Sequence, residues 1–331
     1  MKRKKYYIFL GIVLSVFILV IGMNIRYPFV TPAVGKWSVG YHFSKRIFPK
    51  QNFHPAEIFT YELVDSLVKG NIHYLADPFF IKEKDNFFLF VELKGEGNAD
   101  IALFTAEEDS SFEYQGIVLD EPYHLSYPQV FKYKEEFYML PETKGSNNVL
   151  LYKAKNFPYE WIVEDTLLKN RGLKDPSILL TDDLNLIVAV DDNLKQYMFT
   201  ADSLRGKWTE VENYEQRWGN ETRPGGRFFQ VEETWYLPVQ NRSKGYGTGI
   251  SIYELENKRG KLKLTMNEKL FLGPQKDIVW FNRGMHHLDV QKIDEGYFFV
   301  YDGDRKTGIQ EFQYKRTLKF NFLDFYNFLR H

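Results

Sequence analysis

The stretch Leu75-Ala76-Asp77-Pro78-Phe79-Phe80 decides the fold, because a polar or charged residue followed by proline returns at nearly fixed intervals. The next such dipeptide is Tyr127-Pro128, and Asp175-Pro176 and Arg223-Pro224 continue the series at almost the same spacing. Each return opens a short apolar run, a charged turn and an aromatic-rich run. A fixed period of about 50 residues with several β-type runs inside it is typical of β-propeller blades.

These positions divide residues 72–331 into five repeats, the last of which begins near His286-His287. We therefore predict an all-β domain, a five-bladed β-propeller whose innermost strands carry the residues before proline. The interval from Arg223 to His287 is longer than the others, and we assign the excess to a loop around residues 269–284. The last blade is expected to continue with strands at residues 296–301 and 309–314.

Residues 27–71 are expected to form a linker that contains one strand. Four prolines within residues 27–56 stiffen this part of the chain. Residues 37–43 alternate in the manner of a β-strand. A strand this far upstream of the first repeat is expected to close the ring by joining the last blade.

Residues 1–26 differ in composition from everything that follows. Residues 2–5 are basic, and residues 6–23 form an uncharged run rich in Ile, Leu, Val and Phe. Such a run is long enough to cross a bilayer as a helix. The alternative is a cleaved signal peptide, but its apolar part is usually shorter and ends in small residues. We predict one uncleaved transmembrane helix with a cytoplasmic amino terminus and an extracytoplasmic propeller.

The composition excludes several kinds of site and partner. The chain contains no cysteine, so disulfides, thiolate metal sites and cysteine nucleophiles are excluded. It carries 43 basic and 44 acidic residues, and five of the basic ones lie in residues 1–26, where there is no acidic residue. The remainder is mildly acidic and has no basic stripe. Nucleic acid is therefore not expected as a partner, because phosphate contacts need clustered Lys and Arg.

A second polar series follows the first at one fixed offset in three of the repeats, as Glu92, Glu142 and Asp302. The third and fourth repeats offer Asp191 and Gln240 at slightly larger offsets. The innermost strands of a propeller converge on its axis. One polar residue per blade at a fixed place therefore predicts a ring of polar side chains around a central cavity.

This cavity would bring many carboxylates together with a few cations. Crowded carboxylates push their pKa values apart, which lets a general acid and a base coexist at neutral pH, and glycoside hydrolysis needs such a pair. We assign catalytic roles to Asp77, Asp175 and Glu142. Aromatic faces on which sugars stack could come from Tyr127, Tyr123, Trp235 and Tyr246. The residues expected to bind substrate are Glu92, Tyr127, His124, Asp191, Arg223, Arg227, Gln240, His286, His287 and Asp302.

Each of these residues also has a structural interpretation. An aspartate before proline often caps a turn, and a carboxylate at a strand end is usually solvated. The adjacent His286 and His287 suggest a metal site, but neighbours on a strand point to opposite faces, so at most one is expected to face the cavity. We therefore predict no metal site and no cofactor, and leave a central structural cation open. Recurrence in five repeats is what favours a functional group.

Five segments of the chain resemble the amino-terminal domain of plant glucosamine inositolphosphorylceramide transferases, across residues 72–302. A similar module follows the formyltransferase domain of some bacterial proteins. The segments that carry the resemblance are Ala76-Asp77-Pro78-Phe79-Phe80, Tyr123-His124-Leu125-Ser126-Tyr127-Pro128, Tyr138-Met139-Leu140-Pro141-Glu142-Thr143, Arg223-Pro224-Gly225-Gly226-Arg227 and His286-His287-Leu288-Asp289.

In the plant family the sugar transfer is attributed to a separate carboxy-terminal domain, so the resemblance does not imply glycosyltransferase activity here. The amino-terminal domain in turn resembles the five-bladed glycosidases of the arabinanase and β-xylosidase group. That resemblance implies that Asp77 matches the general base and that Asp175 stands where the group has a glutamate acid. Tyr127 replaces the acid between them, and Glu142 or Glu92 could provide a displaced acid.

Two functions from different classes follow from these observations. The first is a membrane-anchored, extracytoplasmic carbohydrate-active enzyme, a glycosidase acting on a surface or envelope glycan. The second is a non-catalytic propeller that binds such a glycan near the membrane. In both, the partners are a glycan or glycoconjugate and, through residues 6–23, the membrane. The density of carboxylates favours the enzyme, because a lectin has less reason to bury so many like charges.

Overall fold

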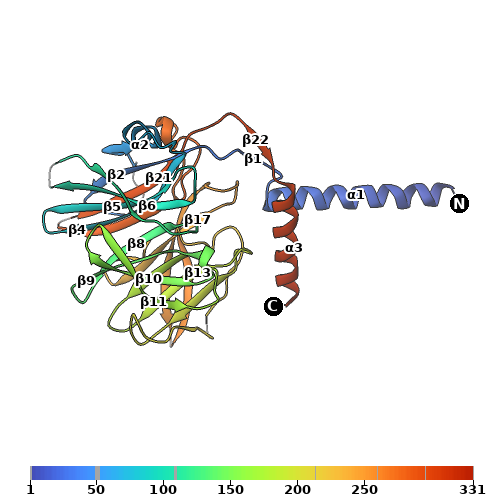
Figure 1. Cartoon of the computed structure of the whole chain (residues 1–331). Helices are drawn as coiled ribbons and strands as arrows, with labels where there is room; N and C mark the ends of the chain where they lie inside the picture. Colours follow the sequence, from blue (N-terminus) through green and yellow to red (C-terminus); the bar gives the residue numbers. More distant parts are fainter. Residues whose placement is uncertain are drawn as a thin grey trace.

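Five antiparallel sheets of four strands each form a β-propeller, as predicted, in a computed structural model of the chain (Figure 1). The structure describes residues 2–48, 53–107, 110–212, 214–258, 260–294 and 296–330. Within the propeller the chain builds one blade after another, and each blade runs from an inner to an outer strand.

The first two blades have long strands whose pairing is interrupted by a few register shifts. Blade one consists of β4 (Tyr74–Glu83), β5 (Asn86–Lys94), β6 (Ala99–Glu107) and β7 (Glu113–Leu119). Blade two consists of β8 (Ser126–Tyr133), β9 (Glu136–Glu142), β10 (Val149–Asn156) and β11 (Glu160–Leu168), with the short helix η1 (Lys144–Ser146) between β9 and β10.

The next two blades are less regular at their edges. Blade three consists of β12 (Lys174–Leu180), β13 (Asn185–Val190), β14 (Gln196–Thr200) and β15 (Thr209–Glu210). Blade four consists of β16 (Phe229–Val231), β17 (Thr234–Asn241), β18 (Gly249–Lys258) and β19 (Lys261–Leu272). Arg223-Pro224 lies ahead of β16, and Pro224 forms an isolated bridge with Val239.

Blade five joins the two ends of the chain. The strands β20 (Leu288–Ile293) and β21 (Gly296–Asp304) come from the carboxy-terminal side, whereas β2 (Trp37–Ser44) and β3 (Glu57–Phe59) come from the amino-terminal side. The pairing of β2 with β21 extends from Trp37 opposite Asp304 to Ser44 opposite Tyr297. The ring is therefore closed by hydrogen bonds between segments from opposite ends of the sequence.

Apolar clusters lie between neighbouring blades and hold them together. Between blades five and one, Phe80 packs on Phe298 with ring centroids 4.3 Å apart, and both belong to a cluster that also contains Val39 and Leu89. Four similar clusters fill the other junctions. Each fully buried large apolar side chain contributes roughly 1.5–3 kcal/mol, so these clusters of aromatic and aliphatic residues stabilise the junctions between the blades.

The prediction for the carboxy-terminal end was wrong. Residues 310–312 form β22 (Gln310–Phe312), which pairs with β1 (Val30–Pro32) in a separate two-stranded sheet instead of with blade five. Helix α3 (Tyr314–Arg330) follows. The reason is that β2 already occupies the place beside β21 that this strand would take.

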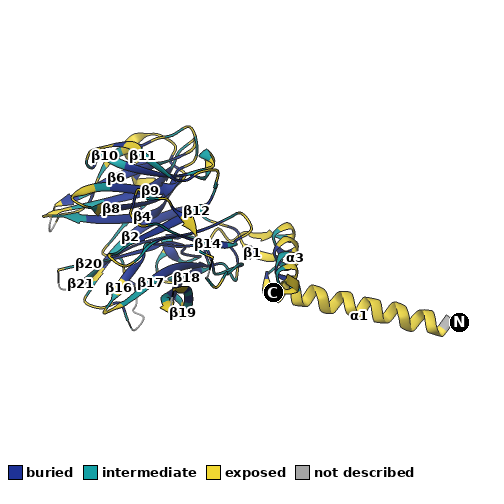
Figure 2. Ribbon diagram, turned by 90° about the horizontal axis from the view of Figure 1, so that it is seen from below, coloured by how far each residue is buried: buried dark blue, intermediate teal, exposed yellow. Residues whose placement is uncertain are grey.

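Two further helices flank the propeller, with a short turn, η2 (Val279–Phe281), before blade five. Helix α2 (Tyr61–Val68) begins after Thr60, whose side chain accepts a hydrogen bond from the backbone of Leu63, an N-cap. Helix α1 (Lys2–Arg26) projects away from the propeller with its side chains exposed (Figure 2). It is long and apolar enough to cross a membrane.

Candidate functional site

The residues before proline share an unusual backbone conformation in the first three blades. Asp77, Tyr127 and Asp175 have φ values of 48°, 53° and 47°. Each lies at a register shift between the first and second strands of its blade, a β-bulge. The left-handed conformation costs roughly 1–3 kcal/mol for a residue other than glycine. A bulge re-aims the side chain, so the repeated dipeptide is the local cause that turns these three side chains toward the axis.

A cavity of about 420 Å³ opens at the end of the axis where the innermost strands begin. Three of the side chains around it are carboxylates, and four can carry positive charge. All five blades or their connections contribute. The lining residues are Val34, Trp37, Tyr74, Ala76, Asp77, Glu92, His124, Ser126, Glu142, Lys174, Arg223, Tyr246 and His286.

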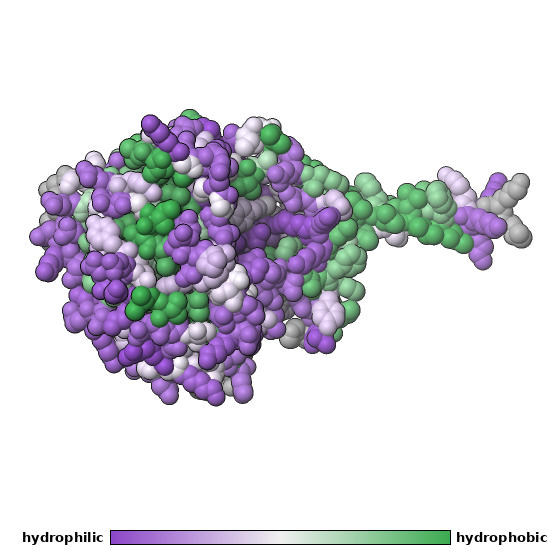
Figure 3. Space-filling view, viewed as in Figure 1, coloured by the Kyte–Doolittle hydropathy of each residue, from purple (hydrophilic) through white to green (hydrophobic). Residues whose placement is uncertain are grey.

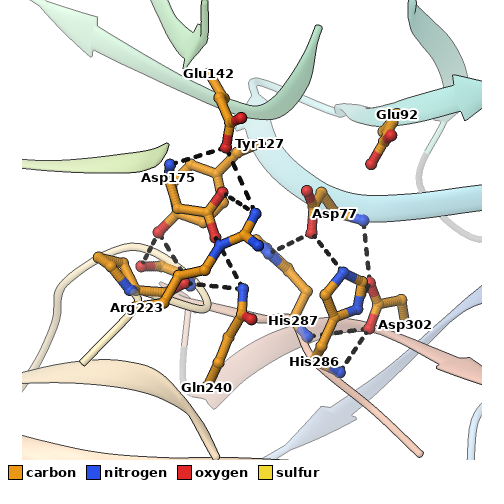
Figure 4. Close-up of polar contacts among 12 residues, drawn as sticks. Asp77, Glu92, Tyr127, Glu142, Asp175, Arg223, Gln240, His286, His287 and Asp302 are labelled. Atoms are coloured by element: carbon orange, nitrogen blue, oxygen red, sulfur yellow. Dashed lines mark hydrogen bonds and ion pairs between the residues drawn. The ribbon is translucent and has the colours of Figure 1, made fainter. Parts of the chain in front are cut away.

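Asp77 lies on one side of the cavity, against both histidines (Figure 4). Its Oδ1 is 3.4 Å from Nε2 of His286 and 3.5 Å from Nδ1 of His287. Both histidines precede β20 and so do not lie on a strand, but at most one of them faces the cavity, as expected. Only His286 lines the cavity, while His287 is buried against Phe79 and Tyr127.

Asp302 holds this cluster in place through hydrogen bonds. Its Oδ1 accepts hydrogen bonds from the backbone N–H groups of His286 and His287, both at 3.0 Å. Its Oδ2 accepts one from the backbone N–H of Asp77 at 3.1 Å and lies 2.7 Å from Nδ1 of His286. Asp302 does not line the cavity itself. It therefore positions the groups that do.

The charges in this cluster shift the pKa values of its members. Burial alone would raise the pKa of Asp77, but the charge of His286 and the contacts with His287 outweigh it and hold that pKa below its usual range. Burial would lower the pKa of His286, but Asp302 and Asp77 raise it to about 9. At neutral pH the cluster therefore contains an ionised Asp77 beside a protonated imidazole.

On the other side of the cavity, Arg223 binds Asp175 and reaches Glu142. Its Nε and Nη2 donate to the two carboxylate oxygens of Asp175 at 2.5 and 2.8 Å. Its Nη2 also lies 3.5 Å from Oε2 of Glu142. Gln240 donates to Asp175 at 2.8 Å. Asp175 is completely buried and does not line the cavity, so Arg223 separates it from any ligand there.

Glu142 and Glu92 both line the cavity with raised pKa values. Burial, and then the charge of Asp175, raises the pKa of Glu142 well above its ordinary value against the opposing charge of Arg223. Burial raises the pKa of Glu92, although a contact with His124 at 3.2 Å opposes it. The hydroxyl of Tyr74 donates to Glu92 at 2.8 Å. The cavity thus combines an easily ionised carboxyl, Asp77, with two that hold their protons more tightly.

Tyr127 lies below the cavity and has a structural role there. Its hydroxyl donates to the carbonyl of Gly226 at 2.6 Å and accepts from the N–H of the same residue at 3.1 Å. A Cβ atom on Gly226 would lie 1.8 Å from the carbonyl oxygen of Leu288. The glycine is therefore required for the close approach of three blades at this point.

Two further predicted site residues, Asp191 and Arg227, lie outside the cavity, as do Tyr127, Asp175, Gln240, His287 and Asp302. Asp191 accepts hydrogen bonds from the backbone of Asn193 and Lys195 at 2.8 and 3.0 Å, so it caps a turn. Arg227 forms a bidentate ion pair with the buried Asp289. Of the four aromatic residues expected to offer a stacking face, Tyr246 is the one that lines the cavity.

Several lining residues were missed in the sequence. Ser126 and Lys174 directly precede Tyr127 and Asp175, so the repeat itself could have identified them. Trp37 lies in the ring-closing strand and packs on His286 with ring centroids 4.1 Å apart. No local signal marks Trp37 or Val34, because they reach the cavity only through closure of the ring.

One group of side chains could share a cation. Ligand atoms of Asp77, His286 and Asp302 lie within 4.8 Å of one another. With the pKa of His286 raised to about 9, the imidazole is protonated and already serves as the counter-charge of the two carboxylates. The arrangement fits an internal ion-pair cluster better than a metal site, because a metal ligand must be deprotonated.

Comparison with known proteins confirms the resemblance found in the sequence. A family model described as glucosamine inositolphosphorylceramide transferase 1, N-terminal, matches residues 56–304. The protein of that name from Oryza sativa subsp. japonica is 32% identical over 250 residues, which cover 70% of this chain and 33% of the relative. The one from Arabidopsis thaliana is 29% identical over 252 residues, 71% of this chain and 33% of the relative. The chain spans about one third of the length of these relatives.

Solved structures of low sequence identity share the fold. An α-L-arabinofuranosidase from Clostridium thermocellum superposes with a TM-score of 0.52 at 12% identity, over 72% of this chain and 85% of the other. An endo-1,4-β-xylanase from Bacteroides thetaiotaomicron gives 0.52 at 13% identity, over 69% and 84% of the two chains. A β-fructofuranosidase from Bombyx mori gives 0.50 at 14% identity, over 68% and 54%.

Proposed function

The chain belongs to the family of glucosamine inositolphosphorylceramide transferase 1 N-terminal domains, and from this premise we propose that it is a membrane-anchored protein that binds a glycan in the central cavity and hydrolyses a glycosidic bond. The names of the relatives and of the structures that share the fold concern sugars, and that supports a carbohydrate ligand. The transferase activity in the relatives' name is not carried over, because the chain covers only about one third of them.

The observation that carries the proposal is the pair of opposite pKa shifts in one cavity. Asp77 ionises easily because of His286, whereas Glu142 holds its proton because of burial and the charge of Asp175. Glycosidases need one carboxylate and one carboxylic acid at the same pH. The cavity offers both, together with hydrogen-bonding groups on Lys174, Tyr246 and His286 for sugar hydroxyls.

In the proposed reaction Asp77 acts as the general base and Glu142 as the general acid. Asp77 takes a proton from a water molecule, whose oxygen attacks the anomeric carbon. Glu142 gives its proton to the glycosidic oxygen as the bond to the leaving sugar breaks. Asp175 and Arg223 act as positioning residues, since Arg223 covers Asp175 and holds Glu142 from the side.

A test of this proposal uses the full chain in detergent, first on a glycan array and then on each glycan that binds. Asp77→Asn and Glu142→Gln are each expected to slow sugar release by about 10²- to 10⁴-fold, because proton transfer at a positioned group contributes on that order. Both should still bind the glycan, since the amides keep the shape. Asp85→Asn, in the exposed turn between β4 and β5, is the matched control. Unchanged release in both cavity variants would disprove the assignment.

The second candidate is a glycan-binding module without catalysis. It is favoured by a specific observation: of the three aligned inner-strand positions, one carries Tyr127 and another carries Asp175, whose charge Arg223 neutralises. Glycan binding without any sugar release, unchanged in Asp77→Asn, would establish this function instead.

The proposed membrane topology rests on the charges around α1. Basic residues 2–5 precede the apolar run and are expected to stay in the cytoplasm. The natural chain has no cysteine, so single cysteines can be labelled without background. A membrane-impermeant maleimide should label Asp85→Cys on intact spheroplasts, whereas Lys4→Cys should react only after permeabilisation. The reverse pattern would overturn the orientation, and an amino terminus near Asn24 would show cleavage.

A further inference from the structure

Helix α3 carries an apolar face that is largely exposed. Leu318, Phe322, Phe325 and Leu329 follow one another at steps of four, three and four, which places them on one side of a helix. Phe322 and Phe325 are about 60% exposed, and Phe328 beside them is 76% exposed. Large aromatic side chains exposed together are typical of an interaction surface.

The opposite face of α3 is fixed to the protein. Phe320 stacks on the buried Tyr27 with ring centroids 5.5 Å apart. Asp324 binds Arg26 at 2.5 Å, and the hydroxyl of Thr317 donates to the carbonyl of Pro28 at 3.0 Å. These contacts set the orientation of α3, so the exposed aromatic face is held outward by its own structure.

Helix α3 lies at the level where the apolar run of α1 ends. The side-chain amide of Asn321 donates to the carbonyl of Met23 at 3.3 Å. Met23 ends the apolar run, because the polar Asn24 follows it, and Arg26 is the first charged residue after it. If α1 crosses a bilayer, α3 is therefore placed at the boundary between the hydrocarbon and the headgroups.

The apolar surfaces of the two helices are continuous. A groove between them is lined by Ile18, Leu19 and Gly22 of α1 and by Phe322, Phe325 and Phe328 of α3. The space-filling view shows hydrophobic surface along α1 that continues onto the region of α3 (Figure 3). Figures 1 and 2 agree that α3 runs across the direction of α1. A helix that lies across a membrane-spanning helix at its end lies along the membrane surface.

We propose that α3 is an interfacial helix, and that its aromatic face is inserted into the same bilayer that α1 spans. This inference rests on the proposed membrane anchoring, and not on the proposed hydrolysis. The charges of α3 fit a lipid surface: the exposed bases Lys315 and Arg330 lie near its two ends, while Arg316 and Lys319 bind the propeller, and its only acid, Asp324, is paired with Arg26. Basic helices with one aromatic face bind at membrane interfaces, more strongly where lipids are anionic.

The inserted helix would also orient the propeller. Lys319 donates to the backbone carbonyl of Asp192 at 3.2 Å, and Arg316 donates to that of Arg242 at 2.8 Å. Arg242 in turn lies over the ring of Tyr246, which lines the cavity. The part of the propeller held by α3 is therefore the part around the cavity mouth, and that end faces the bilayer.

The test uses the full chain in vesicles of phosphatidylcholine with a minor fraction of phosphatidylglycerol. Single cysteines replace Phe325 or Phe328 and are labelled with a polarity-sensitive fluorophore. Two sets of vesicles are compared, one with lipids that carry a quencher near the headgroup and one with lipids that carry it deep in the acyl chain. Leu14→Cys in the middle of α1 is the membrane control, and Asp85→Cys at the far end of the propeller is the aqueous control. All four positions are exposed, so the variants are expected to fold.

The expected result is a blue shift at positions 325 and 328, with stronger quenching by the shallow quencher than by the deep one. Leu14→Cys should show the opposite preference, and Asp85→Cys should show no quenching. Water-exposed labels at 325 and 328, with Leu14→Cys in the membrane, would overturn the interfacial helix alone. Absence of quenching at Leu14→Cys would overturn the anchoring as well. Efficient disulfide formation between Phe328→Cys copies, without lipid quenching, would show that the face binds a second copy of the chain instead.

Discussion

Asp77 and Asp175 occupy equivalent places in blades one and three, yet their surroundings on the two sides of the cavity are chemically different. Each precedes proline, and the two φ values, 48° and 47°, are nearly the same at a bulge. Asp77 lies against two imidazoles and remains in contact with the cavity. Asp175 is held by both nitrogens of a guanidinium and is covered by it. The same local sequence therefore presents an available carboxylate in one blade and a neutralised one in another.

The two carboxylates differ because each is paired with a different kind of cation from another blade. The guanidinium of Arg223 is permanently charged, and its planar fork matches the two oxygens of a carboxylate. An imidazole, unlike a guanidinium, loses its charge once the pH rises above its pKa. We therefore expect the guanidinium of Arg223 to stay charged at every pH, and the imidazole of His286 to lose its charge as the pH rises toward its pKa of about 9.

The largest expected effect comes from removing the guanidinium. Arg223→Met leaves Asp175 buried without its counter-charge, and it should lower the free energy of unfolding by about 3–5 kcal/mol. Urea denaturation followed by tryptophan fluorescence measures the change. Arg205→Met, which removes an exposed ion pair with Glu164, is the control and should cost at most about 1 kcal/mol. Equal losses in both variants would contradict the buried-pair interpretation.

The histidine side should make stability depend on pH in the alkaline range. The pKa of His286 is raised to about 9 in the folded chain, so its stabilising contribution is complete below about pH 6.5 and is lost as the pH rises toward 9. The loss is expected to be on the order of 2–3 kcal/mol. Unfolding free energies measured between pH 6 and 9 should fall in the natural chain and stay level in His286→Gln.

The control for this experiment is His73→Gln, which replaces an exposed histidine at the start of blade one. It should keep the pH dependence of the natural chain. Arg223→Met should also keep it, although at lower overall stability. A level profile in Arg223→Met would mean that the two sides of the cavity are one coupled cluster.

A smaller effect is expected on the pKa of Glu142 when the charge of Asp175 is removed. The charge of Asp175 helps raise the pKa of Glu142, while Arg223 opposes it. Asp175→Asn removes the first influence and leaves Arg223 free to attract Glu142, so the pKa of Glu142 should move down. The interaction removed is on the order of 1–2 kcal/mol. Infrared titration of the carboxyl band measures it, with the exposed Asp294→Asn as control, and an upward movement would contradict the arrangement.

The smallest effect is expected at Asp191, the member of the polar series that lies outside the cavity. Asp191→Asn keeps an acceptor for the backbone of Asn193 and Lys195, so unfolding free energy should change by less than about 0.5 kcal/mol. Glycan binding should not change. A loss of binding comparable to that of a variant at Glu92 would place Asp191 in the site after all.

Much of the cavity followed from the repeat in the sequence. The recurring X-Pro dipeptide located Asp77 in the lining of the cavity, and Tyr127 and Asp175 buried behind it. The second polar series located Glu92 and Glu142 in the lining. These positions were predictable because equivalent residues of successive blades meet at the axis. The series failed at Asp191 because a tight turn in blade three follows β13 at once and uses the carboxylate as its cap.

Helix α3 shows the opposite case. Its apolar residues are spaced for one side of a helix, but the segment just before it was expected to add another β-strand to the last blade. In the structure this segment pairs with β1 instead, because β2 from the other end of the chain fills the edge of blade five. The segment therefore does not join that sheet, and the chain continues as a helix beside α1.

The sequence by itself determined the period, the five blades, the apolar amino-terminal helix and the carboxylates brought to the axis, because each depends on local pattern and on a repeat that packs against its own neighbours. Only the tertiary structure decided which carboxylate is available and which is neutralised. Arg223 stands one repeat after Asp175, and His286 belongs to the last repeat whereas Asp77 belongs to the first. Charge pairing acts through a few ångströms of space, and those distances exist only after β2 has closed the ring against β21.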